Sequence, residues 1–274
     1  MEKTCYLFAG QGSQYPLMGT ELANAFPAAK QVFEAGSDIL GFDLLKACAE
    51  YSAEELARTE VSQPAIMATS LAAYEAAKTL GITADMVAGH SLGEYAAMTS
   101  AGMLTLENAF RVIRERARAM GECAKGQNGA MCAVMGLSAE EIADVCEKTE
   151  GFVIPVNFNS PVQTVIAGEA DAVDRAAGVF AGMGKRTAKL VVSAAFHSKF
   201  MQPAADDFKA AIADIPFSAP HIDFYSNVTG GILTDFEDMP AYLAKHIISP
   251  VQFVSELQLM QENGYQNFIE LGPN

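Results

Sequence analysis

The segment Gly89–Gly93, which reads Gly-His-Ser-Leu-Gly, constrains the fold of this chain more than any other feature. It follows the strand-like run Asp85–Ala88 and precedes a helix-like run from Glu94 to Ala101. A Gly-x-Ser-x-Gly segment between a strand and a helix is typical of a nucleophile elbow, a tight turn that leaves the serine hydroxyl exposed. The first amides of the helix then point at the bend, where an oxyanion can form. The alternative is an ordinary turn in which Ser91 caps the helix.

The bulk composition fits one large α/β domain, or one such domain with an insertion. The chain has 274 residues, of which 50% are hydrophobic, and a formal net charge of −15 at pH 7. Such an acidic chain is not expected to use nucleic acid or an anionic membrane as its main partner. No stretch approaches the ~20 apolar residues of a membrane span, and the N-terminal apolar run is too short for a signal peptide. The five cysteines form no Cys-x-x-Cys pair, which predicts reduced thiols, a cytoplasmic location and no metal site.

The hydrophobic patterning predicts two subdomains. Long helical patterns and short apolar strands occupy residues 1–126, and the same texture returns over residues 194–274. Between them, after a flexible boundary at Gly126–Gly129, residues 127–193 show short elements in the order βαββαβ of a ferredoxin-like unit. We therefore expect an α/β fold in which a hydrolase-like parallel-sheet core carries an inserted ferredoxin-like subdomain.

A serine nucleophile needs a general base, and His197 is the preferred candidate among the four histidines. It lies at the predicted turn between the last strand of the inserted unit and a helix, and strand-end loops often carry catalytic side chains. The alternative is a plain capping histidine. His90 adjoins Ser91 in the elbow and is expected to point elsewhere, while His221 and His246 are expected to be structural or solvent-facing.

No carboxylate stands in a clear position to orient His197, as a complete triad would require. The acidic candidates in the chain order of a hydrolase fall on predicted helices of the inserted unit and are expected to be surface charges: Asp144, Asp171 and Asp174. A dyad whose histidine is held by a backbone carbonyl is therefore the better interpretation.

Two further features suggest an anion site. The loop Gly10–Gln14 can offer backbone N–H groups to an oxyanion or a phosphate, although it lacks the spacing of a nucleotide-binding motif. Arg111, Arg114 and Arg118 repeat at helical spacing and predict a solvated face. Arg116 lies about 200° around the helix from its neighbours at that face, toward the packed side. A buried arginine needs an anion to pair with, and a substrate carboxylate would serve through a bidentate contact.

Taken together, these segments resemble malonyl-CoA:acyl carrier protein transacylases. The matching segments fall in the order of that family between Thr4 and Pro273: Gly10–Gln14, Gln63–Ala65, Gly89–Glu94, Arg116, Asn157–Gln163, Phe196–Ser198 and Ser249–Gln252. The same pattern occurs in acyltransferase domains of polyketide synthases, including free-standing ones. Ala9 replaces the usual proline of the first loop. The family also continues by a further helix after the final predicted strand, so we expect a shortened chain.

The resemblance implies ping-pong transfer of a malonyl group from malonyl-CoA to the phosphopantetheine thiol of acyl carrier protein, as in fatty acid biosynthesis. Ser91 would be the catalytic nucleophile and His197 the general base, with an oxyanion hole made by the backbone N–H groups of Gln11 and Leu92. The substrate-binding residues would be Arg116, as the clamp on the malonyl carboxylate, and Gln63, Phe196 and Gln252. Phe196 resembles the malonyl-selecting form of its motif, and Gln252 matches the position near which a backbone carbonyl orients the histidine.

The resemblance implies no resident cofactor, since the coenzyme A thioester is a substrate and the phosphopantetheine belongs to the partner protein. We expect a monomer. An acidic carrier protein would be repelled by this acidic chain, so a local basic patch is needed. Four basic residues cluster in sequence around His197: Lys185, Arg186, Lys189 and Lys199.

Two other classes stay open. The first is a serine esterase or thioesterase, which the missing acidic partner of His197 and the presence of Arg116 disfavour. The second is a non-catalytic module that binds carrier proteins and retains the fold, which the presence of Ser91, His197 and Arg116 disfavours.

Overall fold

The structure, a computed structural model, describes residues 3–192 and 194–273. The strands of its larger sheet are β1 (Lys3–Phe8), β2 (Met86–Gly89), β7 (Asp223–Ser226), β8 (Gly231–Ile232) and β9 (Tyr265–Leu271). Their order is β8-β7-β2-β1-β9. The strands from β7 to β9 in this order run parallel, and the short β8 pairs antiparallel with β7 at one edge.

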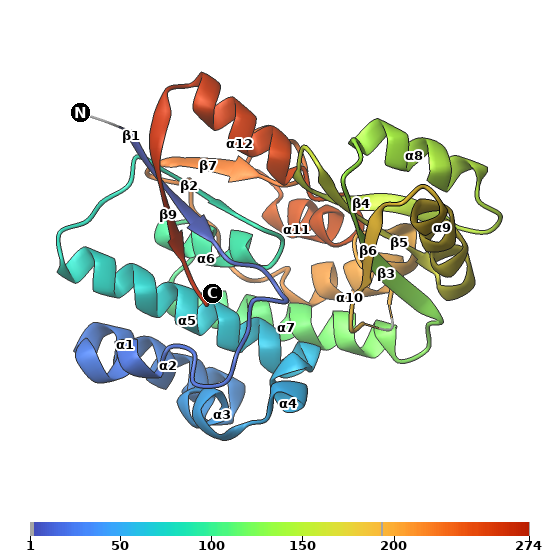
Figure 1. Cartoon of the computed structure of the whole chain (residues 1–274). Coiled ribbons are helices and arrows are strands. Elements are labelled where there is room, and N and C mark those ends of the chain that lie inside the picture. The colour runs from blue at the N-terminus through green and yellow to red at the C-terminus, as the bar shows by residue number, and fades with distance from the viewer. Residues whose placement is uncertain (1–2, 193, 274) are drawn as a thin grey trace.

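Helices cover both faces of this sheet (Figure 1). The helices of the larger subdomain are α1 (Thr20–Ala25), α2 (Pro27–Leu40), α3 (Leu44–Glu50), α4 (Ala53–Ala57), α5 (Thr59–Thr79), α6 (Gly93–Ser100), α7 (Leu106–Ala124), α10 (Gln202–Ala211), α11 (Met239–Ile248) and α12 (Phe253–Glu262). A short 3-10 turn, η1 (Lys199–Met201), precedes α10.

Alternation along the strands divides the core between the two faces, as the period of two in a β-strand requires. Tyr6 and Phe8 join the large core that contains residues of α5, α6 and α7. Cys5 and Leu7 belong to a smaller cluster with Met260 of α12. The sheet is therefore buried on both faces, which is typical of parallel sheets, and its strands end at a common edge where the loops gather.

The second sheet is formed by β3 (Gly129–Met135), β4 (Val153–Ser160), β5 (Gln163–Glu169) and β6 (Arg186–Lys189), with the helices α8 (Ala139–Lys148) and α9 (Ala170–Gly182). Its order is β4-β5-β3-β6, and each neighbouring pair is antiparallel. This is the arrangement of a ferredoxin-like βαββαβ unit. The predicted fold class, an α/β parallel-sheet core with a ferredoxin-like insertion, is confirmed; the residue boundaries of the two subdomains stay a prediction.

One face of the small sheet packs on its own helices and the other packs on the larger core. Cys132 and Ile166 contact the α8 and α9 side, whereas Met131 and Val165 belong to the large core. The two subdomains therefore share one continuous apolar interior. Within the described ranges, no helix has the length and apolar character to cross a bilayer, and the five cysteines are free of disulfides.

Candidate active site

Ser91 stands at a sharp bend between β2 and α6, with a left-handed backbone at φ 51°. That conformation is uncommon for residues other than glycine and costs about 1–3 kcal/mol. The glycines on either side make it possible. A Cβ on Gly89 would lie 2.0 Å from the Gly93 carbonyl carbon, and one on Gly93 would lie 2.1 Å from the Phe8 oxygen. The elbow is therefore packed backbone against backbone, and its geometry depends on both glycines.

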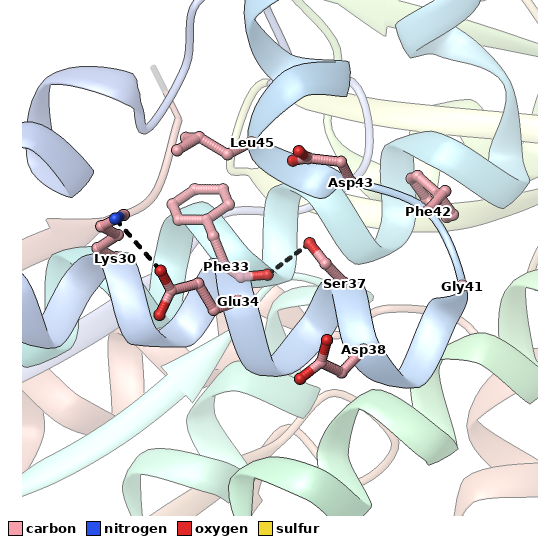
Figure 2. A pocket seen from close by; sticks show the side chains of 9 residues that line it. All are labelled: Lys30, Phe33, Glu34, Ser37, Asp38, Gly41, Phe42, Asp43 and Leu45. Carbon is pink, nitrogen blue, oxygen red and sulfur yellow. Dashed lines mark hydrogen bonds and ion pairs between the residues drawn. The ribbon is translucent and has the colours of Figure 1, made fainter.

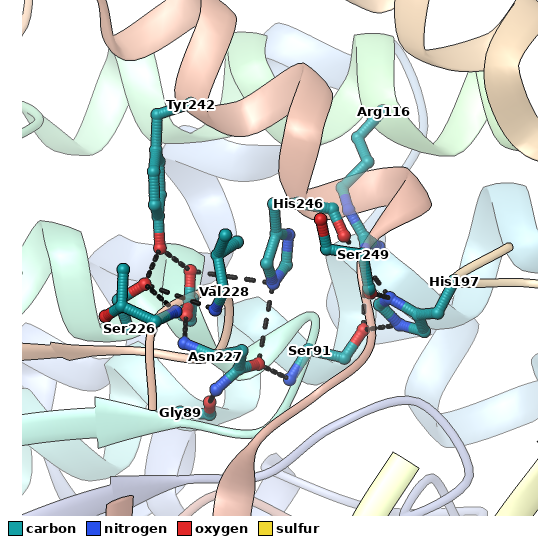
Figure 3. A network of polar contacts seen from close by, with 12 residues as sticks. Gly89, Ser91, Arg116, His197, Ser226, Asn227, Val228, Tyr242, His246 and Ser249 are labelled. Carbon is teal, nitrogen blue, oxygen red and sulfur yellow. Dashed lines mark hydrogen bonds and ion pairs between the residues drawn. The ribbon is translucent and has the colours of Figure 1, made fainter. Parts of the chain in front are cut away.

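The Ser91 hydroxyl lies beside the His197 imidazole, with 2.8 Å between Oγ and Nε2. Both side chains are buried, at 8% and 3% exposure. The other ring nitrogen of His197, Nδ1, faces the carbonyl oxygen of Ser249 at 3.0 Å and that of His246 at 3.3 Å. These carbonyls accept a hydrogen bond from Nδ1–H, which keeps the proton of the neutral ring on Nδ1 and leaves Nε2 unprotonated, ready to take the proton of Ser91 (Figure 3).

The carbonyls that hold His197 belong to the C-terminal end of α11. His246 lies in the last turn of that helix and Ser249 is its C-cap. The negative end of a helix dipole stabilises a nearby positive charge, so this helix end supplies what a carboxylate supplies in a triad. Burial and the neighbouring Arg116 charge lower the pKa of His197 to about 3. The imidazole is therefore neutral in the free protein and can act as a base.

Arg116 lies on the buried face of α7, as the helical spacing predicted, at 1% exposure. Its Nη2 donates to Ser91 Oγ over 3.2 Å, and its Nη1 donates to Gln63 Oε1 over 2.7 Å. The guanidinium carbon also lies 5.1 Å from the ring centre of Tyr95. Among the described residues, Nε has no hydrogen-bond partner. A buried cation with a free donor next to the nucleophile is a site for an anion, above all a carboxylate.

The Gly10–Gln14 loop lies directly against the elbow. The amide of His90 donates to the Phe8 oxygen over 3.0 Å, and a Cβ on Gly10 would lie 2.5 Å from the His90 oxygen. In the part of the chain that the structure describes, the amides of Gln11 and Leu92 donate no backbone hydrogen bond. Two unused amides on adjoining loops are what an oxyanion hole requires.

A cleft of about 540 Å³ opens beside this loop, lined by residues 7–13, His90, Asn159, Gln163, Phe253 and residues 270–273. His90 turns into the cleft wall, where its Nε2 lies 2.8 Å from Asn159 Oδ1. Asn159 in turn donates to Gln163 Oε1 over 3.1 Å. His90 is thus hydrogen-bonded to Asn159 of the inserted subdomain and not to Ser91, in keeping with the expectation that it is not the base.

A second hollow, of about 440 Å³, lies between α2 and α3 (Figure 2). Its polar groups pair locally: Lys30 Nζ lies 3.3 Å from a Glu34 oxygen, and Ser37 Oγ donates to the Phe33 oxygen. It contains no group suited to acyl transfer, so the elbow and its cleft remain the candidate site.

Not every predicted site residue reaches the dyad. The backbone N–H of Gln252 donates to the backbone carbonyl of Asn227 over 3.0 Å, and the backbone carbonyl of Gln252 accepts from the N–H of Glu256. The carbonyls on His197 therefore come from residues that precede Gln252 in the chain. Phe196 is buried in the core beside the histidine. The three acidic candidates of the inserted unit are exposed, as expected: Asp144, Asp171 and Asp174.

Sequence reasoning missed Asn227 and the buried carboxyl groups around it. Asn227 Oδ1 accepts from the Ser91 amide over 2.6 Å. Both Glu94 and Glu256 are fully buried and contact Asn227. A signal was available, because Asn227 follows the strand β7, and polar residues at the carboxyl ends of parallel strands gather at functional sites.

A family model described as the acyl transferase domain matches residues 5–274. The malonyl CoA-acyl carrier protein transacylase of Bacillus subtilis (strain 168) is 38% identical over 277 residues, covering 100% of this chain and 87% of the relative. The solved structure of the malonyl CoA-acyl carrier protein transacylase from Coxiella burnetii is 34% identical, with a TM-score of 0.96 over 100% of this chain and 88% of that one. A malonyl-transacylase solved in complex with a type II PKS acyl-carrier protein is 36% identical, with a TM-score of 0.94 over 99% and 89%.

Proposed function

The chain belongs to the acyl transferase domain family, and from that membership we propose that it moves a malonyl group from malonyl-CoA to the phosphopantetheine thiol of an acyl carrier protein. The names of its relatives, which are 31–38% identical over the whole chain, support this substrate and this partner. The observation that carries the proposal is that Ser91 Oγ lies between His197 Nε2 at 2.8 Å and Arg116 Nη2 at 3.2 Å. A nucleophile, its base and a carboxylate clamp thus meet at one oxygen.

In the first half-reaction the malonyl carboxylate pairs with Arg116, which Gln63 holds in place. His197 takes the proton of Ser91, whose Oγ attacks the thioester carbonyl carbon. The resulting oxyanion is stabilised by the amides of Gln11 and Leu92. The carbon–sulfur bond then breaks, His197 returns its proton to the departing coenzyme A thiolate, and a malonyl-serine ester remains.

The second half-reaction runs the same steps with a different thiol. His197 accepts the proton of the phosphopantetheine thiol, the sulfur attacks the malonyl-serine carbonyl, and the ester bond breaks. The proton returns to Ser91 Oγ, so His197 ends neutral. The cleft with His90, Asn159 and Gln163 provides amide and imidazole groups suited to the amides of a pantetheine arm.

Fatty acid biosynthesis is the proposed pathway, with a free-standing polyketide synthase acyltransferase as the alternative, because one similar structure is a complex with a type II PKS carrier protein. A serine hydrolase is disfavoured by Arg116, whose charge has no carboxylate partner in the described site. We also propose a cytoplasmic location, a monomer, and chemistry that needs no resident cofactor; the free cysteines support the first of these.

The test is a partition experiment with malonyl-CoA labelled in the malonyl group and a phosphopantetheinylated acyl carrier protein. The proposal predicts that most of the label that leaves Ser91 appears on the carrier protein. Release of the label mainly as free malonate would identify a hydrolase, and no transfer of label in the presence of intact enzyme would identify a binding module.

A further inference from the structure

We propose that Asn227 is a positioning residue that holds the bend of the nucleophile elbow in its reactive geometry. This inference rests on the proposed role of Ser91 as the nucleophile. Asn227 follows β7 and is fully buried. It lies 136 positions from Ser91 in the sequence, yet its side chain lies between Gly89 and Ser91 and contacts both (Figure 3).

The Asn227 carboxamide bridges the two ends of the bend. Its Oδ1 accepts from the Ser91 amide over 2.6 Å, and its Nδ2 donates to the Gly89 carbonyl over 2.7 Å. Nδ2 also donates to Glu256 Oε1 over 2.7 Å, and Oδ1 lies 3.4 Å from His246 Nε2. Each hydrogen-bonding position of the amide is therefore used. Reversing the amide would set donor against donor at Ser91, so its orientation is fixed.

The backbone closes the bend between the Gly93 amide and the His90 carbonyl, over 2.9 Å, whereas the Asn227 bridge joins Gly89 to Ser91, which that bond does not connect. The left-handed φ of 51° at Ser91 is a conformation that persists only where surrounding contacts enforce it. Within the described ranges, Asn227 is the side chain that hydrogen-bonds to the backbone of residues 89–93. It touches both the carbonyl before the bend and the amide at the bend, so it sets the direction of Ser91 Oγ toward His197.

A ring of buried groups keeps Asn227 itself in place. The backbone N–H of Asn227 donates to Glu94 Oε1 in the first turn of α6, while Glu256 of α12 accepts from the Asn227 side chain. Tyr242 of α11 donates to Glu94 Oε2 over 2.9 Å, and His246 Nε2 lies 3.5 Å from the same oxygen. Burial raises the pKa of Glu94 to about 8 and that of Glu256 well above its ordinary value, and it lowers the pKa of His246. The surroundings of Asn227 are thus nearly uncharged apart from Arg116 on the far side of Ser91.

The substitution Asn227→Asp tests the bridge with little change of shape. It keeps an acceptor for the Ser91 amide, but it places a carboxylate against the Gly89 carbonyl and the Glu256 carboxyl. Protonation at lower pH turns that group into a donor again. We therefore expect the acylation rate of this variant, relative to the unsubstituted chain, to rise as the pH falls, a response that a merely structural loss would not give.

The rate is measured as labelling of Ser91 by a neutral fluorophosphonate, and as single-turnover acylation by malonyl-CoA. For Asn227→Ala we expect both rates to fall by about 100-fold, the loss typical of a small misplacement of reacting groups, with the Kd for malonyl-CoA unchanged. Tyr242→Phe is the matched control: its hydroxyl contacts Glu94 Oε2 and Ser226 but neither Asn227 nor the bend, so labelling should fall far less than in Asn227→Ala. Fluorophosphonate labelling needs no malonyl-CoA, so it tests the positioning even where malonyl transfer itself fails.

Labelling of folded Asn227→Ala at the unsubstituted rate, or a loss confined to the Kd for malonyl-CoA, would overturn the proposal. An equal loss in Tyr242→Phe would do the same. Should neither Asn227 variant fold, Glu256→Leu and Glu256→Gln replace them. The first removes an acceptor of Asn227 Nδ2 and is expected to slow labelling by about tenfold, while the second retains that acceptor and the rate; equal rates for the two would contradict the proposal.

Discussion

Arg116 donates from Nη2 to Ser91 Oγ over 3.2 Å, so the cation that we propose binds the substrate carboxylate directly contacts the proposed nucleophile. The same charge helps to keep His197 neutral. Recognition and chemistry therefore share one short chain of contacts. In the proposed mechanism, a malonyl carboxylate bound to Arg116 places the acyl carbon at the serine, whereas an acetyl group offers the guanidinium no partner.

Replacing Arg116 by alanine should remove the preference for malonyl-CoA. We expect the kcat/KM for malonyl-CoA to fall by about 100-fold, since hydrogen bonds to a charged group contribute roughly 1.5–3 kcal/mol each and about 1.4 kcal/mol is a factor of ten. The kcat/KM for acetyl-CoA should fall far less. Arg118→Ala is the control, because Arg118 lies on the same helix but is exposed and pairs with Asp207 and Glu115. Retained malonyl preference in Arg116→Ala would refute the clamp.

The pH dependence of Ser91 labelling reports on His197. The pKa of this imidazole is lowered from 6.5 to about 3, first by burial and then by Arg116. A lowered pKa means that the base stays unprotonated as the pH falls through 6.5, so labelling by a neutral serine reagent should decline only toward the lower value. In Arg116→Met the pH at which labelling declines should be higher, because the positive charge that disfavours protonation of His197 is gone. A limb centred at the ordinary histidine value in the unsubstituted chain would contradict this electrostatic account.

Two glycine-to-alanine substitutions, one in the elbow and one on an exposed helix face, should have opposite effects on the free energy of unfolding. Gly93→Ala would place a Cβ 2.1 Å from the Phe8 oxygen and should destabilise the fold by about 3 kcal/mol, as overpacking does. Gly178→Ala lies on the exposed face of α9 with no heavy atom within 4 Å of the added Cβ. It should stabilise the fold by about 0.5–1 kcal/mol, the helix preference of alanine over glycine. Urea unfolding measures both, and equal effects would argue against a close-packed elbow.

The carrier protein should respond to charge near His197. Lys199 follows the histidine closely, is exposed, and lies 4.2 Å above the Phe152 ring. Lys199→Glu should raise the KM for carrier protein several-fold by adding repulsion to an acidic partner, while acylation by malonyl-CoA is unchanged. Lys30→Glu, on α2 beside Glu34, is the control. Parallel losses in both half-reactions would count against a docking role. Lys189 already pairs with Asp174, so it contributes less free charge than the sequence suggested.

The sequence allowed the elbow, the insertion and the burial of Arg116 to be predicted, because each depends on local spacing. Glycines around a serine between two apolar runs predict a bend, and helical geometry places Arg116 opposite Arg114 and Arg118. These features need no knowledge of the rest of the chain.

The partners of the dyad could not be predicted in the same way. A backbone carbonyl as the partner of His197 was expected, but the sequence did not identify the carbonyls of Ser249 and His246, because a backbone acceptor leaves no trace in residue type. Asn227 reaches Ser91 across 136 positions, through the pairing of β2 with β7. Such contacts follow from the order of strands in the sheet, which the hydrophobic pattern alone does not specify.

The most direct test of the account is the intact mass of the chain after a short incubation with malonyl-CoA, without carrier protein. We expect the addition of one malonyl group, located on Ser91, absent in Ser91→Ala and much slower in His197→Ala. Addition of phosphopantetheinylated carrier protein should return the chain to its original mass. A chain that gains no malonyl group, or that gains it at a residue other than Ser91, would contradict the account.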